Sequence, residues 1–323
     1  MNNRIENAFP HLRPAESHGI DLMVVGDTGI DLMVRVDDLP KTDGKAIGES
    51  LGIFAGGMGA NFAYAARKSA VKLSIALISK VGADAFGEAC LQALREQDID
   101  THLVVVEPGQ LTWWCAVAID GEGEKALLGG RTDASLPDAK QTSEVQFENV
   151  RWVHSLGDVP SSLEVIMAAQ AAGAIASVDI EGSFVTGQRI QAEKLVAQAD
   201  FVIVNTDSLR MLTGEENYDL ALRQLLRHRT HAAILLTRGG AGSAFAFTDS
   251  TSTFHLVERT AAPVATVVDT TGAGDSFAGT FVASALRHGD LAEAMAAASE
   301  MAAQTIGHLG ARPGGLPGWI RPT

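Results

Sequence analysis

The stretch at residues 264–279 constrains the fold more than any other part of the chain. Residues 264–268 are apolar and β-prone, and a glycine-containing turn at residues 269–274 follows them. Apolar residues then recur at helical spacing from Phe277 onward. This order predicts a strand, a tight turn and a helix. The unpaired N–H groups and the dipole at the start of such a helix favour a bound phosphate group.

A carboxylate, Asp275, lies inside this predicted anion-binding turn, where it would repel a phosphate that was merely held. Its position makes sense if it takes a proton from a hydroxyl that attacks phosphorus, while neighbouring N–H groups stabilise the transferring group. A plain N-terminal helix cap is the other interpretation, because Asp is common there. The run is neither a Walker A loop nor a dinucleotide fingerprint, since Phe277 stands where the third glycine should be.

The sequence Asp-Thr-Thr-Gly-Ala-Gly-Asp-Ser-Phe-x-Gly at residues 269–279 resembles the C-terminal signature of the ribokinase-like family, the phosphofructokinase-B-type carbohydrate kinases. The resemblance implies that Asp275 is the general base of phosphoryl transfer. It also implies that the amides of three preceding residues form the anion hole: Gly272, Ala273 and Gly274.

The same resemblance implies ATP and Mg²⁺ as cofactors, with Asp269 and Thr271 as candidate metal ligands beside the anion hole. Residues 306–314 resemble the monovalent-cation loop of the family. K⁺ is therefore a further candidate ion at this turn.

The second glycine turn, Gly-Gly-Met-Gly-Ala-Asn at residues 56–61, resembles the N-terminal signature of the family. In that signature a glycine pair and an Asn hold sugar hydroxyls, here Gly56, Gly57 and Asn61. Glycines let the main chain approach a polyol, and an Asn amide both donates and accepts hydrogen bonds. Without the resemblance, an ordinary glycine-rich turn would be the simpler interpretation.

Asp31 matches an early Asp of the family that accepts hydrogen bonds from sugar hydroxyls, and a solvated turn residue is the alternative. The pattern departs from ribokinase proper at two positions of the implied sugar site. Gly29 stands where an Asn would be expected, and Met58 stands where a Lys is found. Ribose is therefore not implied as the acceptor.

Asn205 matches the first residue of the Asn-x-x-Glu element, which serves magnesium and phosphate in the family. Ser208 stands where the Glu should be. Asp207 lies one residue earlier and could act through water, or the acidic role lies elsewhere in the chain.

Residues 237–242 follow a predicted strand and resemble the Thr-x-Gly-x-x-Gly nucleotide loop of the family. The implied nucleotide contacts are Thr237, Gly239 and Gly242. The start of a β-hairpin explains the same glycines equally well.

Strands and helices alternate from residue 151 onward, which predicts a parallel sheet covered on both faces. The resulting fold class is a three-layer α/β/α domain of the ribokinase-like type, with a mostly parallel central sheet and a small β-sheet lid. We expect residues 21–323 to form this domain and residues 35–55 and 100–131 to supply the lid. Residues 1–20 are expected to be an extension that is disordered or packs across a subunit interface.

Composition excludes several classes of protein. With 46% hydrophobic and 20% charged residues among 323, the chain is globular. Its formal charge of −14 argues against nucleic acid or an anionic membrane as a partner. Two cysteines, Cys90 and Cys115, exclude a disulfide framework and indicate a reducing cytoplasm. No apolar run approaches the roughly 20 residues of a membrane span.

These observations predict an ATP-dependent kinase that phosphorylates a hydroxyl of a small sugar or sugar derivative. A nucleoside kinase of the same family is an alternative, because the adjacent Trp113 and Trp114 could stack a base. A non-catalytic protein that binds a sugar or nucleotide is another, because Ser208 replaces the family Glu. The resemblance also implies a homodimer formed through the lid.

Overall fold

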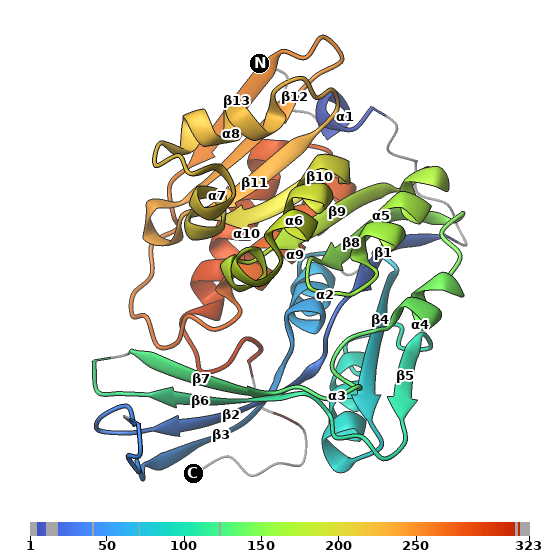
Figure 1. Ribbon diagram of the computed structural model, residues 1–323. Coiled ribbons are helices and arrows are strands. Elements are labelled where there is room, and N and C mark those ends of the chain that lie inside the picture. The colour runs from blue at the N-terminus through green and yellow to red at the C-terminus, as the bar shows by residue number, and fades with distance from the viewer. Residues whose placement is uncertain are drawn as a thin grey trace.

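A computed structural model describes residues 5–10, 19–40, 42–70, 72–122, 124–313 and 316. The described strands form one nine-stranded and one four-stranded sheet. Helices lie on both faces of the larger sheet, and the smaller sheet stands at one end of it (Figure 1). The predicted three-layer α/β/α architecture with a small β-sheet lid is confirmed.

The large sheet has the strand order β13-β12-β11-β10-β9-β8-β1-β4-β5. Its strands are β1 (Ile20–Val25), β4 (Ile75–Gly82), β5 (Val104–Glu107), β8 (Val150–Leu156), β9 (Ile175–Ile180), β10 (Phe201–Asn205), β11 (Ala233–Thr237), β12 (Ser243–Thr248) and β13 (Phe254–Arg259). All neighbours from β5 to β11 are parallel, whereas β12 and β13 add antiparallel strands at the edge. The central strands are buried along nearly their whole length, because both faces of the sheet are covered.

Two groups of helices cover the two faces of the large sheet. On one face lie α5 (Ser162–Ala171), α6 (Gly182–Gln198), α7 (Thr206–Thr213) and α8 (Tyr218–Leu226). On the other lie α2 (Met58–Ser69), α9 (Ala273–His288) and α10 (Leu291–Thr305). The remaining helices are α1 (Ile5–Ala8), α3 (Ala85–Arg95) and α4 (Ala139–Ser143). In the described part of the chain, none of these helices has the length and apolar character needed to cross a bilayer.

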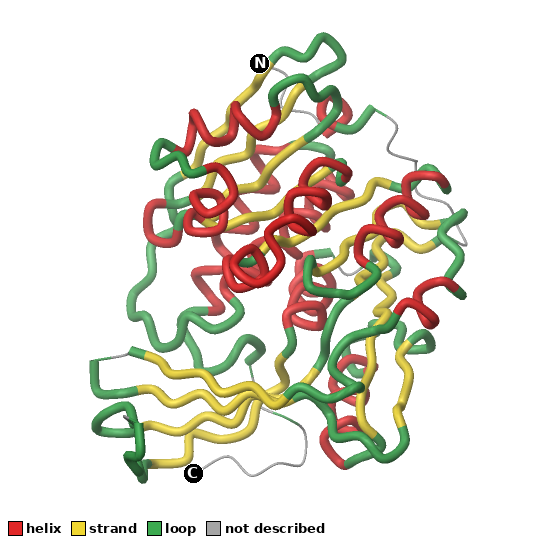
Figure 2. The backbone as a smooth tube through the Cα atoms, in the orientation of Figure 1, coloured by secondary structure: helices red, strands yellow, loops and turns green. Residues whose placement is uncertain are grey.

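The four-stranded sheet, called the lid below, has the order β3-β2-β6-β7. Its strands are β2 (Gly29–Arg35), β3 (Glu49–Gly56), β6 (Trp114–Ile119) and β7 (Lys125–Gly130). Loops occupy the region between the lid and the helices of the large sheet (Figure 2).

The observed lid differs from the predicted one in two places. It includes all of β2, which begins at Gly29 rather than near residue 35. The predicted lid strand near residue 104 is instead β5, which pairs in parallel with β4 in the large sheet. Helix α3 connects β4 to β5, so the three form a parallel crossover unit. A short apolar run carries no information about which sheet it joins.

The carboxyl ends of the parallel strands determine where a site can form. The turns that follow β1, β8, β9, β10 and β11 lie at one edge of the sheet, and that edge faces the lid. Ligands of open α/β sheets bind at this edge, outside the carboxyl ends of the strands.

The N-terminal helix packs against its own chain. Ala8 and Phe9 are fully buried. The Phe9 ring meets the rings of Trp152 and Phe201 edge-on, with centroids 5.2 and 5.9 Å apart. Ala8 and Phe9 are therefore part of the core of their own chain. Residues 1–4 and 11–18 of the predicted extension lie outside the described residues.

Replacing Phe9 should destabilise the protein strongly. We expect Phe9→Ala to lower the free energy of unfolding by about 3 kcal/mol, because it removes a buried aromatic side chain and leaves a cavity. Urea denaturation followed by circular dichroism measures this change. Met167→Ala is the control, because that side chain on α5 is 52% exposed. Equal, small effects of both substitutions would contradict the docking of Phe9.

Candidate active site

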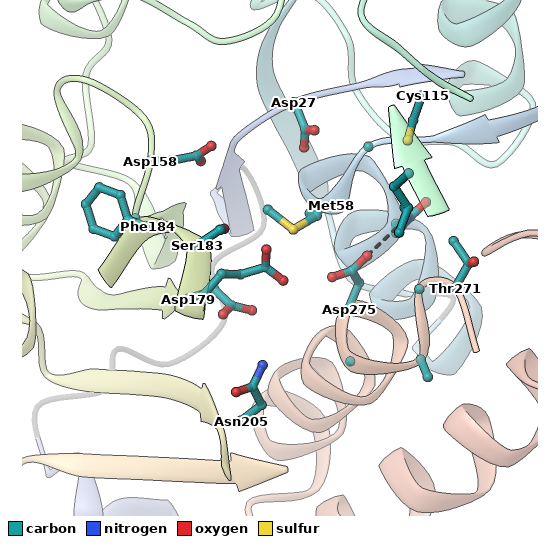
Figure 3. A pocket seen from close by; sticks show the side chains of 18 of the residues that line it. Asp27, Met58, Cys115, Asp158, Asp179, Ser183, Phe184, Asn205, Thr271 and Asp275 are labelled. Atoms are coloured by element: carbon teal, nitrogen blue, oxygen red, sulfur yellow. Dashed lines mark hydrogen bonds between the residues drawn. The ribbon is translucent and has the colours of Figure 1, made fainter. Parts of the chain in front are cut away.

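A cavity of about 780 Å³ lies between the lid and the edge of the large sheet. Figure 3 shows acidic side chains pointing into it from several elements. Nine of the residues predicted to contact substrate or phosphate line it: Asp31, Gly57, Asn61, Asn205, Thr237, Gly272, Ala273, Gly274 and Asp275. Thr271, predicted to bind metal, lines it as well.

The predicted turn and helix are present, but the apolar residues 264–268 before them form no strand. Asp275 is not the residue that caps the helix. Helix α9 begins at Ala273, and its N-cap is Gly272, which has a positive φ of 72°. A side chain at Gly272 would also collide with Ala311. No side chain caps this helix end. Its first N–H groups are therefore available to an anion in the cavity.

Asp275 lies in the first turn of α9 and faces α2. Its Oδ2 accepts a hydrogen bond of 2.9 Å from Nδ2 of Asn61, drawn as the dashed line in Figure 3. The two residues are 214 positions apart in the sequence and come from the two predicted signatures. The structure thus joins the predicted sugar loop to the predicted base.

The orientation of the Asn61 amide is fixed by Arg312, a residue that the sequence analysis missed. Arg312 is 5% exposed. Its Nε donates to Oδ1 of Asn61 at 2.9 Å, and its Nη2 donates to the carbonyl of Gly56 at 2.6 Å. Asn61 must therefore present its N–H₂ group to Asp275. Gly56 does not line the cavity, and its carbonyl helps to hold Arg312 in place. The residues around Arg312 in the sequence gave no indication of this role.

The side of the cavity next to the start of α2 is built from close main-chain approaches. Gly57 has a φ of 90°, and a side chain there would come within 2.6 Å of the Cα of Thr28. Asp27 accepts a hydrogen bond of 3.0 Å from the N–H of Gly59. Asp31 is 8% exposed and lies against Gly56. Asp27 also lines the cavity and was not predicted.

Burial in this acidic cavity raises the pKa of its carboxyl groups. Burial raises the pKa of Asp275 to about 7, the Asn61 hydrogen bond opposes the shift, and nearby carboxylates add to it. Burial likewise raises the pKa of Asp27 to about 7 and that of Asp31 to about 6. A carboxylate with a pKa near 7 is well matched to general-base work at neutral pH.

Acidic residues at the end of β9 line the cavity close to Asn205 at the end of the neighbouring strand β10. Asn205 caps α7, with its Oδ1 accepting from the N–H of Ser208 at 2.8 Å. Asp179 and Glu181 line the cavity, and Asp179 lies across from Asn205 in Figure 3. Burial raises the pKa of both carboxylates. Neither was predicted from the sequence.

Thr237 and the two glycines that follow it have separate positions. Thr237 lines the cavity, whereas Gly239 and Gly242 are not among its lining residues. They lie in the turn between β11 and β12, which pair in antiparallel fashion. The hairpin interpretation thus describes the local geometry. Nucleotide contacts at these glycines stay a prediction.

Asp269 is not part of the cavity wall, although Thr271 is. The Asp269 side chain is completely buried. Its Oδ1 accepts from the N–H and the hydroxyl of Thr271 at 3.0 and 2.7 Å and from the ammonium of Lys125. Burial would raise the pKa of Asp269, but these hydrogen bonds outweigh it and hold the pKa below its ordinary value.

A glycine turn that leads into an uncapped helix N-terminus, a carboxylate beside it and a polar cavity under a lid define the class of protein. Together they are the parts of a kinase that transfers a phosphoryl group to a hydroxyl. The model of the pfkB family of carbohydrate kinases matches residues 20–318. The chain therefore belongs to this family and is a phosphotransferase with an alcohol group as acceptor.

Relatives of known description agree with this family. The chain is 30% identical over 295 residues to an ATP-dependent ribose-1-phosphate kinase of Halopiger xanaduensis, covering 91% of this chain and 94% of that protein. It is 30% identical over 283 residues to a fructokinase of Vibrio alginolyticus, covering 83% and 84%. The structure of Arabidopsis thaliana ribokinase with ribose and ATP superimposes with a TM-score of 0.73 at 22% identity, covering 90% and 94%, which supports the fold.

Replacing Asp275 with Asn should raise stability at alkaline pH. The folded-state pKa of about 7 lies above the ordinary Asp pKa of 3.8. Between those values the folded state holds a proton that the unfolded state has lost, so stability falls as pH rises through this window. We expect Asp275→Asn to unfold with a free energy about 1 kcal/mol or more above wild type at pH 8, and with a smaller difference at pH 4.

Urea titrations of the ligand-free protein at a series of pH values measure this difference. Asp207→Asn is the matched control, because the Asp207 side chain on α7 is 73% exposed. A stability difference that does not change with pH would show that Asp275 titrates as an ordinary carboxyl group.

Proposed function

We propose that the chain is an ATP-dependent kinase that phosphorylates a hydroxyl of a small sugar or sugar derivative, with Asp275 as general base. The observation that carries the proposal is the position of Asp275. Its carboxylate lies beside the uncapped N-terminus of α9 and accepts a hydrogen bond from Asn61 inside the cavity.

The acceptor hydroxyl is proposed to lie between Asp275 and the loop that begins α2. Asp31 and Asn61 orient the acceptor through hydrogen bonds, and Gly57 allows the main chain to approach it. Asp275 takes the hydroxyl proton as the oxygen attacks phosphorus. The amides of residues 272–274 stabilise the charge on the transferring group. The lid keeps water away from this centre.

The ATP side is proposed to use Asn205 and Thr237, with Gly239 and Gly242 farther along the same turn. A second cavity of about 720 Å³, lined by residues 259–266 and by α10, is available for the adenine base of ATP. In the described part of the chain, no three acidic, His or Cys side chains converge around one metal-sized point. Mg²⁺ would instead take phosphate oxygens and water, with Asp179 or Glu181 as protein ligand, and would neutralise phosphate charge.

The charge of the cavity favours a neutral acceptor. Six carboxylates line it or its rim: Asp27, Asp31, Asp158, Asp179, Glu181 and Asp275. The two lining cations are each already paired, Lys125 with Asp269 and Arg131 with Asp158. A second anionic group on the acceptor would meet a field of the same sign.

A nucleoside kinase is the second candidate, because Trp113 lines the cavity and offers an aromatic face. The relatives include a nucleoside kinase of Methanothermobacter thermautotrophicus, 25% identical over 272 residues. A non-catalytic binding protein fits less well, since a sensor does not need a carboxylate tuned near pH 7 beside an anion hole. We further propose a cytoplasmic homodimer formed through the lid, whose Leu127 and Leu128 are 64% and 68% exposed.

The acceptor is identified by measuring ATP-to-ADP turnover with a panel of ketoses, aldoses, sugar acids, nucleosides and sugar phosphates. We expect turnover with a neutral sugar or a nucleoside. Preference for ribose 1-phosphate or another sugar phosphate would contradict the argument from cavity charge while leaving the kinase proposal intact. No ADP formation with any acceptor would remove the kinase proposal.

Asp275→Asn tests the proposed base. The substitution keeps the size and hydrogen-bonding capacity of the side chain but cannot accept the proton. We expect kcat to fall by roughly 10²–10⁴-fold, the usual contribution of general-base catalysis. Binding of acceptor and ATP, measured by calorimetry, should be retained, because Asn61 and the amides are unchanged. Near-normal turnover by this variant would refute the mechanism.

Hydrogen exchange tests closure of the lid. If β2, β3, β6 and β7 close over the acceptor, then acceptor alone should slow exchange of their amides, and ATP alone should not. Mass spectrometry of peptides from residues 29–56 and 114–130 measures the effect, with peptides from α8 as the control. Equal protection by either ligand would mean that the lid does not respond to the acceptor.

A further inference from the structure

Lys125 is a lid residue whose ammonium reaches the turn that forms the anion hole. It begins β7, yet its Nζ contacts the carboxylate of Asp269 and lies 3.1 Å from the hydroxyls of both Thr270 and Thr271. Its side chain is only 17% exposed. The side chains of Asp269, Thr270 and Thr271, all in one turn, thus surround a single cation that belongs to the lid.

The turn and the loop at residues 306–310 are joined directly, with Asp269 at the centre. Oδ2 of Asp269 accepts from the N–H of Gly310 at 2.9 Å. The N–H groups of Val268 and Asp269 both point to the carbonyl of Ile306, at 2.8 and 3.3 Å. Both oxygens of the Asp269 carboxylate are therefore engaged by groups of this chain.

These contacts leave no place for K⁺ at the ligands that the sequence predicted. The Lys125 ammonium already occupies the side-chain oxygens of Asp269 and Thr271, and a monovalent metal ion bound by the same oxygens would be repelled by it at close range. An ammonium group carries the same single charge and binds oxygen acceptors. The residues at this turn therefore fit the ammonium group of a lysine of the same chain rather than a bound metal ion.

We infer that Lys125 is a built-in monovalent cation that replaces K⁺ at the phosphoryl-transfer turn and orders the anion hole when the lid is closed. The inference rests on the proposed kinase function, which gives the turn its task. Lys125 acts as a positioning residue, because it reaches the amides of residues 272–274 through Asp269 and Thr271. Since it belongs to the lid, an opening lid would withdraw the charge from the turn.

The first test is the dependence of turnover on the added cation. Wild-type kcat should not change when KCl is replaced by NaCl or tetramethylammonium chloride at equal ionic strength. Lys125→Ala should lose about tenfold or more in kcat, because it leaves the buried Asp269 carboxylate without its cation. Ammonium or methylammonium chloride should restore part of that loss in a saturable manner, and tetramethylammonium should not.

Two controls keep the test specific. Lys45→Ala removes another lysine of the lid region, one that is exposed, and should keep wild-type kcat in every salt. Lys125→Arg keeps a positive charge and serves where Lys125→Ala does not fold. It should retain more activity than Lys125→Met, which keeps length without charge.

A second readout separates this inference from the kinase proposal, because it needs no acceptor. The melting temperature of Lys125→Ala should rise with ammonium chloride more than with tetramethylammonium chloride, while wild type shows no such difference. If the acceptor panel fails but this shift occurs, the cation site stands and the kinase proposal falls. Activation of wild type by K⁺ over tetramethylammonium, or full activity of Lys125→Ala without cation dependence, would overturn the inference.

Discussion

The hydrogen bond between Asn61 and Asp275 is the interaction on which the arrangement of the site depends. It connects the first turns of α2 and α9, which belong to different halves of the chain and pack side by side under the large sheet. The close approach depends on Gly279 of α9, where any side chain would collide with the main chain of Phe62. The last glycine of the signature at residues 269–279 thus serves packing. It brings the turn of the proposed anion hole within reach of Asn61, which we propose orients the acceptor.

The cost of placing Asp275 in a crowded acidic cavity explains much of the surrounding structure. Its charge is disfavoured by burial and by neighbouring carboxylates and is favoured by the Asn61 N–H₂ group. The positive end of the α9 dipole lies beside it. Arg312 contributes indirectly, because it turns Asn61 so that a donor faces Asp275. The carboxylate is therefore kept near its point of titration and not locked in either form.

Sequence patterns predicted the parts of the site that lie in continuous motifs. Residues 269–275 and 56–61 could be identified because turn, glycine spacing and helix start follow one another in the chain. Arg312, Lys125 and Asp179 could not be identified in this way. Each stands alone in its segment, and its role comes only from elements that meet in the folded protein.

The same limit applies to the fold. Alternating strands and helices predicted the parallel sheet, but β5 was assigned to the wrong sheet, because a short run of three valines does not encode a partner strand. Excluding a helix-cap role for Asp275 also required the structure. Only the conformation of Gly272 shows that another residue occupies the cap position.

Two cations, Arg312 and Lys125, hold the two halves of the proposed reaction centre, and the groups of each are already engaged by this chain. Arg312 holds Asn61 and the Gly56 carbonyl on the acceptor side. Lys125 holds Asp269 and Thr271 on the phosphate side. The charge of Lys125 is paired with Asp269, and hydrogen-bond donors of Arg312 are used by Asn61 and Gly56. The carboxylates that line the cavity therefore remain in excess over free cations. On the proposed function, such a cavity suits a neutral polyol, and the positive charge for the phosphates would come from main-chain amides and from a metal ion that enters with the nucleotide. The division of labour explains how a chain with a formal charge of −14 can still serve phosphoryl transfer.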